Sequence, residues 1–442
     1  MRNKVLRILA IVLGALFLLF FAFLNGYPIV YADTSTFLAS GFELETPFDR
    51  PITYGLFLWL TSFAGLTLWG PIFFQSLILS FLIFKVTALF LPDKKLLWGF
   101  ILLMALLSTL TGVSWVASQL ISDVFTPIMV LSLLLILIGR HSAAQKAALF
   151  FLYTLAVAMH MSHVSIGIVL IILAALYFLL LEKKAAKPVL INLSIALALT
   201  IASIFTMGSA LSKSKHAFLF AALVEHGIVK EYLDEHCGEE NYRMCEYKDQ
   251  LPDKAWVFLW DESSPFYALG DFKGTKDEFN EIINATLTSP KYLVLHVKAS
   301  LQATFDQLLR FNMGDGNGDF MAGTLLHERV ARYVSHELDA YERSKQNQKS
   351  MSYVSTFNLI QHVFIALTAM FLLWMLMRWK TLDPQLRGII VLTTLAVLVN
   401  AWACGTFANA IDRLGVKMIW LIPLVVFYGV LGRTRDESIT KE

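Results

Sequence analysis

The sequence predicts an all-α polytopic membrane protein with about ten transmembrane helices, and two observations lead to this class. Hydrophobic residues make up 57% of the 442 residues and charged residues only 16%, and the mean hydropathy is +0.61. Soluble domains carry about 25% charged residues. Apolar runs of roughly 20 residues, the length needed to cross a bilayer, recur along the chain. The predicted spans are residues 5–24, 70–91, 96–113, 121–139, 147–161, 163–181, 188–207, 357–377, 388–405 and 415–432.

The first apolar run, residues 5–24, is interpreted as a retained span and not as a signal peptide. Arg2, Lys4 and Arg7 precede it, as they would precede a signal peptide. However, the run is longer than the usual apolar region of about 7–15 residues in a signal. It ends in Asn25-Gly26-Tyr27-Pro28, which lacks the small residues of a cleavage site.

The positive charges predict the orientation of the spans. Fifteen Lys and Arg residues fall on one side of the predicted membrane, whereas the opposite short loops carry only Arg50, Arg413 and Lys417. Because positively charged loops stay in the cytoplasm, both termini are predicted to be cytoplasmic. Together with the cysteine pattern described below, this predicts a multi-pass protein of the bacterial inner membrane whose long loop is periplasmic.

This orientation divides the chain into three parts. Residues 1–207 form an N-terminal transmembrane module whose first outer loop, residues 26–69, carries interfacial helices. Residues 208–355 form a periplasmic domain, and residues 356–442 form a C-terminal transmembrane module. The periplasmic part holds 16 Lys and Arg against 22 Asp and Glu, a net charge of −6. Because nucleic-acid binding needs a strongly basic face, nucleic acid is not expected as a partner.

The periplasmic part is expected to be mostly helical. Apolar residues recur at helical spacing over residues 216–236, 278–311 and 325–345. The second of these stretches contains Ser289-Pro290, where a break is expected. Residues 253–272 are aromatic and punctuated by Pro and Gly, so they are expected to form a loop that lies on the membrane interface.

Two cysteines of the periplasmic part, Cys237 and Cys245, lie eight residues apart. This spacing fits a local disulfide, which an oxidising compartment allows. Two unpaired thiols are the alternative. A zinc site is disfavoured, because the spacing is wider than that of a CxxC motif and no second pair of cysteines exists.

The first outer loop begins with an isolated acid, Asp33, and continues as an amphipathic stretch to Leu44. Such a stretch can lie flat in the headgroup layer of a membrane. Arg50 and Pro51 then form a rigid corner before Tyr54, which begins an apolar helix that is too short to span a bilayer. The order of these features predicts interfacial helices directly after the first span.

This loop resembles the GT-C superfamily of membrane glycosyltransferases that use polyprenyl-phosphate sugars, of the protein O-mannosyltransferase and aminoarabinose transferase type. Members carry a catalytic Asp, often followed by Glu, in the first outer loop, and interfacial helices with a basic-Pro corner come next. Asp33 matches the Asp, and Arg50-Pro51-Ile52-Thr53-Tyr54 is similar to the corner, so the resemblance implies that Arg50 and Tyr54 bind the substrate or the lipid phosphate. Thr34 stands in place of the second acid, and Ile52 in place of a second Pro.

Asp123 lies near the outer end of the fourth predicted span. An ionisable side chain at this depth is costly and is a functional candidate by default. Members of the superfamily often carry an acid at this position, so the resemblance implies a role beside Asp33. The alternative is an acid at a helix start, where it interacts favourably with the helix dipole.

His160 and His163 lie in a very tight outer turn between two predicted spans. Such a pair can bind a divalent metal together with Asp33 or Asp123, and this is the one metal site that the sequence suggests. The resemblance implies a second role, contact with a lipid phosphate, because related enzymes often have Lys at this turn. The third interpretation is a pair of interfacial polar residues without a role in chemistry.

Arg413 and Lys417 lie one helical turn apart at the start of the last span. The resemblance implies that the Arg binds the phosphate of the lipid carrier, a role that suits its planar guanidinium. The alternative is an interfacial Arg whose charged end reaches toward water. Residues 315–319 (DGNGD) lack the Gly and Glu that a calcium-binding EF-hand loop requires, and they are interpreted as a turn.

The resemblance therefore implies a glycosyltransferase with Asp33 and Asp123 as catalytic residues. Arg413, with His163 or Lys417, would hold the phosphate of a polyprenyl-phosphate-linked sugar. Asp33 would act as general base toward an envelope glycan, lipid or protein acceptor.

Three other functions stay open at this point. One is a surface-polysaccharide polymerase or ligase, in which Arg310, Arg329 or Arg332 of the long loop would bind a lipid diphosphate. A lipid or solute flippase is the second, although the inverted repeats of transporters are not apparent. The third is a non-catalytic scaffold of an envelope complex.

Overall fold

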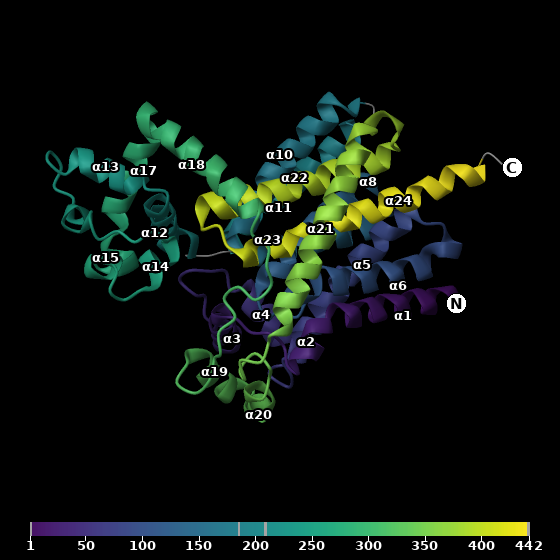
Figure 1. Cartoon of the computed structure of the whole chain (residues 1–442), viewed down its shortest axis with the longest axis horizontal. Helices are drawn as coiled ribbons and strands as arrows, with labels where there is room; N and C mark the ends of the chain where they lie inside the picture. The colour runs from purple at the N-terminus through teal and green to yellow at the C-terminus, as the bar shows by residue number, and fades with distance from the viewer. Residues whose placement is uncertain (1, 184–185, 207–209, 440–442) are drawn as a thin grey trace.

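The computed structural model describes residues 2–183, 186–206 and 210–439, and these residues fold into helices joined by turns and loops. The predicted all-α class is confirmed for this part of the chain. The helices surround two apolar cores. The larger core draws side chains from Ala10 to Tyr428, and the smaller one draws them only from Ala217 to Tyr292. The smaller core belongs to a helical lobe at the left of Figure 1.

Within the described residues, six helices are long and apolar enough to cross a membrane, so the chain is a multi-pass membrane protein. Many of their apolar side chains are exposed, such as Leu367, Met370 and Leu373, as expected for surfaces that face lipid. The six are α5 (Trp69–Phe90), α10 (Met161–Leu180), α11 (Ala186–Thr206), α21 (Tyr353–Met377), α22 (Pro384–Phe407) and the segment Asp412–Leu431, which joins α23 (Asp412–Ile419) to α24 (Leu421–Ile439).

The other four predicted spans are helices too, but they are shorter or more polar. α8 and α9 contain 14 and 16 residues, and α1 contains 17, fewer than the roughly 20 that a bilayer requires. α6 begins with Asp93, Lys94 and Lys95. The count of ten spans therefore stays a prediction. The four helices are α1 (Arg2–Leu18), α6 (Asp93–Leu110), α8 (Phe125–Ile138) and α9 (Ala143–Ala158).

The first outer loop contains the two short helices that were predicted there, α3 (Ala32–Glu43) and α4 (Thr53–Thr61). They follow α2 (Phe20–Asn25), which ends at Gly26 in the left-handed conformation (φ 81°). α3 and α4 cross closely, because a Cβ on Gly41 would lie only 2.1 Å from the carbonyl oxygen of Gly55. Because neither glycine has a side chain, the backbones of α3 and α4 approach closely and α4 packs directly on α3.

The strand-like residue Ile29 fixes the loop to the chain before α8. Its N–H donates to the carbonyl of Ser118, and its carbonyl accepts from the N–H of Leu120, each at 2.9 Å. This contact brings the start of α3 beside two short helices, α7 (Val113–Ala117) and the 3-10 helix η1 (Ser122–Val124). The predicted span at 121–139 is therefore wrong at its start, because Asp123 lies in η1 and not inside an α-helix.

The helical lobe is built from short helices around a disulfide. The predicted Cys237–Cys245 bond is present, with the two Cα atoms 5.6 Å apart. The expectation of a loop over residues 253–272 is wrong, because this stretch forms three short helices that bury Phe258 and Phe266 in the smaller core. The lobe comprises α12 (Ala210–Glu225), α13 (Ile228–His236), η3 (Arg243–Tyr247), α14 (Ala255–Trp260), α15 (Pro265–Ala268), α16 (Asp271–Gly274) and α17 (Lys276–Thr288).

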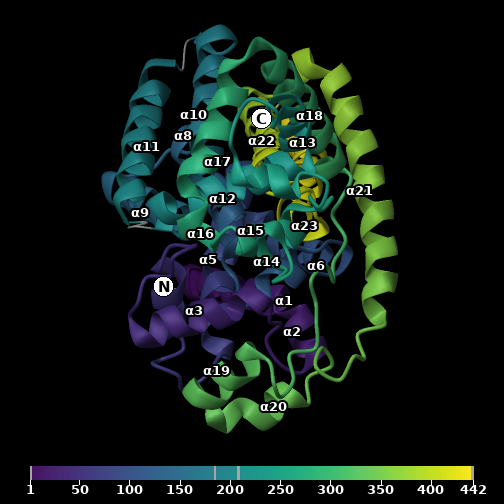
Figure 2. The same cartoon turned by 90° about the vertical axis from the view of Figure 1, so that its left-hand side faces the viewer.

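The rest of the long loop leaves the lobe and joins the larger core. α18 (Pro290–Leu308) starts at the predicted break and packs along α22. The single helix expected over residues 325–345 is wrong: the chain forms α19 (Leu325–Tyr333), η4 (Ser335–Glu337) and α20 (Leu338–Glu342), because Val334 leaves the helical conformation and is buried in the larger core. Figure 2 shows α19 and α20 below α3.

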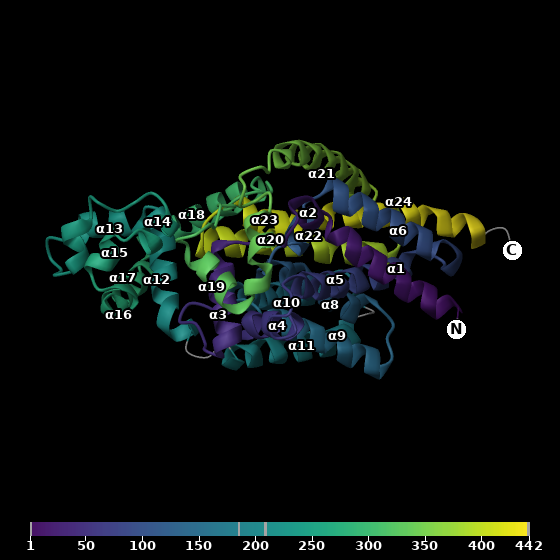
Figure 3. The ribbon, with the colours of Figure 1, turned by 90° about the horizontal axis from the view of Figure 1, so that it is seen from below.

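Both described ends of the chain lie at the end of the molecule that is remote from the helical lobe (Figures 1 and 3). This is the arrangement that two cytoplasmic termini and an outer lobe would produce. The short η5 (Trp379–Thr381) joins α21 to α22. The division of the chain at residues 207/208 falls outside the described residues, and the three-part organisation stays a prediction.

Candidate functional site

Asp33 occupies the first turn of α3, where its negative charge interacts favourably with the helix dipole. Its carboxylate accepts a hydrogen bond from Arg413 at 2.9 Å and lies 3.0 Å from a guanidinium nitrogen of Arg50. Its neighbour Thr34 is buried and donates to the carbonyl of Leu120 at 3.0 Å. The residue that replaces the second acid of the related motif thus anchors the start of α3.

Arg50 holds Asp33 from the loop between α3 and α4. It contacts Asp33 through one terminal nitrogen and Asp49 through the other, the latter at 2.6 Å, and its guanidinium lies 5.2 Å from the centre of the Phe37 ring. Tyr54, predicted as a substrate-binding residue, is fully buried in this structure. Its hydroxyl donates to Gln75 at 3.1 Å, and its ring packs against Phe37. Tyr54 therefore supports Phe37, the ring that contacts Arg50.

Arg413 reaches the same place from the first turn of α23. Its guanidinium lies between two carboxylates, 2.9 Å from Asp33 and 3.5 Å from Asp123. The guanidinium also stacks over the ring of Tyr31, 4.1 Å from its centre, a favourable cation–π geometry. The backbone N–H of Arg413 donates to Asp315 at 3.1 Å, which fixes the start of the helix.

Asp123 and Lys417 form the deepest pair. The ammonium of Lys417 lies 3.4 Å from Asp123, and the side chains of Lys417 and Asp123 are only 1% and 6% exposed. Lys417 lies one turn beyond Arg413 on α23, so one face of this helix presents both cations to Asp123. Of the carboxylate's two oxygens, the one facing Arg413 has no hydrogen bond. Asp123 is therefore held by a hydrogen bond to one of its oxygens and by an ion pair at the other.

These six side chains form a charged cluster that consists of Asp33, Asp49, Arg50, Asp123, Arg413 and Lys417. Acids and bases alternate along it, and three charges of each sign give a formal net charge of zero. Its members come from α3, the loop before α4, η1 and α23. Because each base contacts an acid, an incoming anion would compete with a carboxylate for these cations.

The two arginines control the acidity of Asp33. Burial alone raises the pKa of this carboxyl, but the positive charges of Arg50 and Arg413 outweigh burial and hold its pKa well below the ordinary value. Asp33 is therefore ionised at neutral pH, and its readiness to accept a proton depends on how strongly the two arginines remain attached to it.

The histidines have a different environment from the one expected. His163 is fully buried, with one ring nitrogen 2.8 Å from the hydroxyl of Thr126 and the other 2.7 Å from the carbonyl of Ala156. Both nitrogens are thus engaged within the protein, which leaves none for a metal or a phosphate. His160 caps α10, because its ring accepts from the N–H of Ser162 at 3.2 Å.

The side chains of the suggested metal site do not form a ligand set. Within the described ranges, no three His, Cys, Asp or Glu side chains lie close enough together to hold a metal ion. Asp33 and Asp123 are bridged by the guanidinium of Arg413, and His163 is occupied by other partners. The carboxylates of this site are therefore paired with arginine and lysine side chains, and they do not fit a divalent metal.

Three residues that contribute to the site escaped the sequence analysis: Tyr31, Asp49 and Asp315. Asp315 belongs to the DGNGD stretch, which forms the expected turn, but its carboxylate caps α23. Its neighbour Gly316 adopts φ 70°, and a Cβ there would lie 2.0 Å from the Tyr31 ring. The glycines of this turn were visible in the sequence, but the ring that they accommodate lies nearly 300 residues away.

No protein-family model, curated protein or solved structure matches this chain.

Proposed function

We propose that this protein is an integral membrane glycosyltransferase that moves a sugar from a polyprenyl-phosphate donor to an envelope acceptor on the outer side of the membrane. The observation that supports this most strongly is the contact between Asp33 and Arg413. An acid of the first outer loop meets an arginine at the start of the last span, as the resemblance to the GT-C superfamily implies. The lobe and the termini lie at opposite ends of the molecule, an arrangement that suits a transferase whose lobe faces the outer side (Figure 1).

In this proposal, Arg413 and Lys417 bind the phosphate of the donor. A planar guanidinium can donate two parallel hydrogen bonds to phosphate, and an ammonium one turn away adds a second positive charge. The phosphate would displace Asp33 from Arg413. This exchange conserves the charge around Arg413, because the phosphodiester of the donor and the displaced carboxylate each carry one negative charge.

The exchange would also activate Asp33. Once phosphate neutralises Arg413, one of the two charges that lower the pKa of Asp33 is removed, so the carboxylate becomes a stronger base. Arg50 continues to hold it in position through the second oxygen. The donor would thereby generate the base that its own reaction needs.

The reaction is then a single displacement. Asp33 takes the proton of an acceptor hydroxyl or amine, and the acceptor atom forms a bond to the anomeric carbon of the sugar. The bond between that carbon and the phosphate oxygen breaks, and the polyprenyl phosphate leaves with the electron pair. Arg413 and Lys417 stabilise the charge that develops on the leaving oxygen. The configuration of the anomeric carbon is inverted.

Asp123 acts in this scheme as a positioning residue. It lies 3.4 Å from Lys417 and 3.5 Å from Arg413, on the buried side of both cations. Its negative charge offsets the cost of burying these two cations before the donor arrives. An Asp123→Asn variant should therefore raise the KM for the donor more than it lowers kcat.

The proposal is tested by sugar transfer in membranes that contain radiolabelled polyprenyl-phosphate sugars and the cell envelope. Asp33→Asn and Arg413→Ala, at normal protein levels, should each lower transfer at least 100-fold. Arg332→Ala is the matched control, because Arg332 lies 3.3 Å from an acid of α3, Glu43, but is largely exposed. Full transfer by the first two variants would refute the proposal. Loss of transfer in Arg332→Ala alone would favour a polysaccharide polymerase or ligase.

A further inference from the structure

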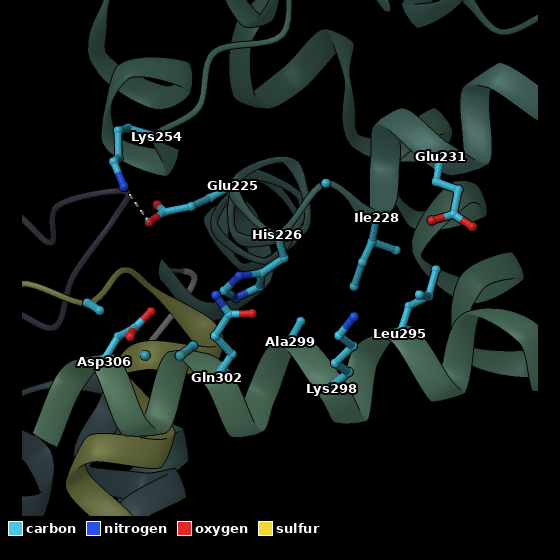
Figure 4. Close-up of a pocket in the computed structure, with 14 residues that line it drawn as sticks. Glu225, His226, Ile228, Glu231, Lys254, Leu295, Lys298, Ala299, Gln302 and Asp306 are labelled. Atoms are coloured by element: carbon cyan, nitrogen blue, oxygen red, sulfur yellow. Dashed lines mark hydrogen bonds and ion pairs between the residues drawn. The ribbon is translucent and has the colours of Figure 1, made fainter.

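A cavity of about 370 Å³ lies between the helical lobe and α18, apart from the charged cluster. Its volume falls within the range of about 300–1,000 Å³ that is typical of ligand sites. Residues at the end of α12 and the start of α13 form one wall, and a face of α18 forms the other (Figure 4). Gly405 and Ala410 also line the cavity.

Two acids of the cavity already have partners within the protein. Glu225 accepts from the backbone N–H of Ala255 at 2.8 Å and lies 3.5 Å from Lys254. Glu231 forms an ion pair with Lys291 at 3.2 Å. Their charges are therefore compensated, and they contribute little to the selection of a charged ligand.

The polar side chains that α18 contributes to the cavity have no such partners. Lys298, Gln302 and Asp306 follow one another at intervals of four residues, so they line one face of the helix over about 12 Å. Among the described residues, no side-chain ion pair or hydrogen bond engages these three groups. Figure 4 shows them along the floor of the cavity, with His226 above Gln302. The Nε2 atom of His226 is buried and also has no hydrogen-bond partner.

The chemistry of these four groups indicates the class of ligand. Lys298 donates, Asp306 accepts, and Gln302 does both, as does a neutral imidazole. Burial lowers the pKa of His226, so this ring is neutral at pH 7. One positive and one negative charge cancel, which disfavours a phosphate or a cationic ligand. Alternating donors and acceptors on a shallow helix face suit a neutral ligand that carries many hydroxyl groups.

We infer that this cavity is a carbohydrate-binding subsite that holds a neutral sugar through Lys298, Gln302, Asp306 and His226. The three side chains of α18 extend over about 12 Å along the helix, a spacing that fits a disaccharide better than a single hexose. If the proposed function is right, the bound sugar belongs to the acceptor. Nothing in the inference about sugar binding itself depends on that assignment.

The position of the cavity fits a role beside the charged cluster. Gln307, the residue after Asp306, holds the backbone of Ile411 through two hydrogen bonds of 2.9 and 3.1 Å. Ala410 lines the cavity, and Arg413 follows three residues later. One short stretch of chain thus connects the subsite to the cation that would bind the donor phosphate.

The test is binding of the full-length protein, in lipid nanodiscs free of sugar detergents, to an array of neutral and phosphorylated glycans. We expect binding to at least one neutral glycan of two or more sugars. Gln302→Ala and Asp306→Ala should each weaken this binding at least tenfold. Thr304→Ala is the matched control on the same helix, because Thr304 donates a hydrogen bond to the carbonyl of Ser300 in its own helix and does not line the cavity.

Three results would overturn the inference: binding to no neutral glycan, binding to phosphorylated glycans alone, or binding that the two cavity variants leave unchanged. The assay requires no sugar transfer. A failure of the subsite is therefore distinguishable from a failure of the proposed reaction, which is measured separately with the Asp33 and Arg413 variants.

Discussion

Asp33 and Arg413 are 380 positions apart in the sequence and 2.9 Å apart in space. The sequence could single out each of them, because an isolated charge beside an apolar run is unusual. It could not show that they touch, since that contact depends on how α3, η1 and α23 pack. The same limit explains why His163 was overestimated: its two partners, Thr126 and the Ala156 carbonyl, come from neighbouring helices.

At this scale, the buried pair of Asp123 and Lys417 should be sensitive to the loss of one partner. Lys417→Met leaves Asp123 without its nearest cation, and breaking a buried pair costs about 3–5 kcal/mol. We expect a lower melting temperature. Unfolding is measured with a thiol-reactive dye, which labels the buried Cys404 when the protein unfolds. Adding Asp123→Asn should recover part of the loss. The exposed Lys380→Met is the control, and an equal effect there would contradict the assignment.

The depressed pKa of Asp33 predicts a pH dependence of stability. A carboxyl whose folded pKa lies below its unfolded value of about 4 contributes stability above that pH, and the contribution is lost as the pH falls through the folded pKa. The melting temperature of the wild type should therefore exceed that of Asp33→Asn by a constant amount from pH 8 to pH 5. The gap should narrow only below about pH 4. Narrowing already between pH 7 and pH 5 would show that the pKa is raised.

At the scale of elements, most helices could be predicted because their apolar spacing is local. The break before Pro290 and the two short helices of the first loop followed from the sequence alone. The helices within residues 253–272 could not be predicted, because Pro and Gly residues separate helices of four to six residues that are stable only on the smaller core. Val334 interrupts the last helix of the long loop for a similar reason, since its side chain is buried in the larger core.

The crossing of α3 and α4 gives a prediction at this scale. A methyl group on Gly41 would lie 2.1 Å from the carbonyl oxygen of Gly55, which is backbone and cannot move aside. Gly41→Ala should therefore displace α3, with a loss of about 1–3 kcal/mol that is typical of overpacking and a fall in transfer activity. Gly238→Ala is the control, because nothing lies within 4 Å of its added Cβ. An unchanged melting temperature in Gly41→Ala would contradict this account of the crossing.

At the scale of the whole molecule, the lobe and the termini lie at opposite ends, so the predicted orientation places them on opposite sides of the membrane (Figure 3). Cysteines introduced one at a time measure the orientation directly, because the native cysteines do not react with the label. Two of them form the disulfide, and Cys404 is buried. A membrane-impermeant maleimide should label Ser263→Cys in the lobe of intact cells. It should label Thr381→Cys, between α21 and α22, only after the membrane is opened. The reverse pattern would place the charged cluster on the cytoplasmic side.

The central claim is that Asp33 and the donor phosphate compete for Arg413, and one experiment tests it most directly. Binding of polyprenyl phosphate to the purified full-length protein is measured alongside sugar transfer for the same variants. We predict that Asp33→Asn binds polyprenyl phosphate at least as tightly as the wild type but transfers no sugar, whereas Arg413→Ala loses both. If Asp33→Asn weakened binding as much as Arg413→Ala, or if Arg413→Ala bound normally, the exchange at the charged cluster would be wrong.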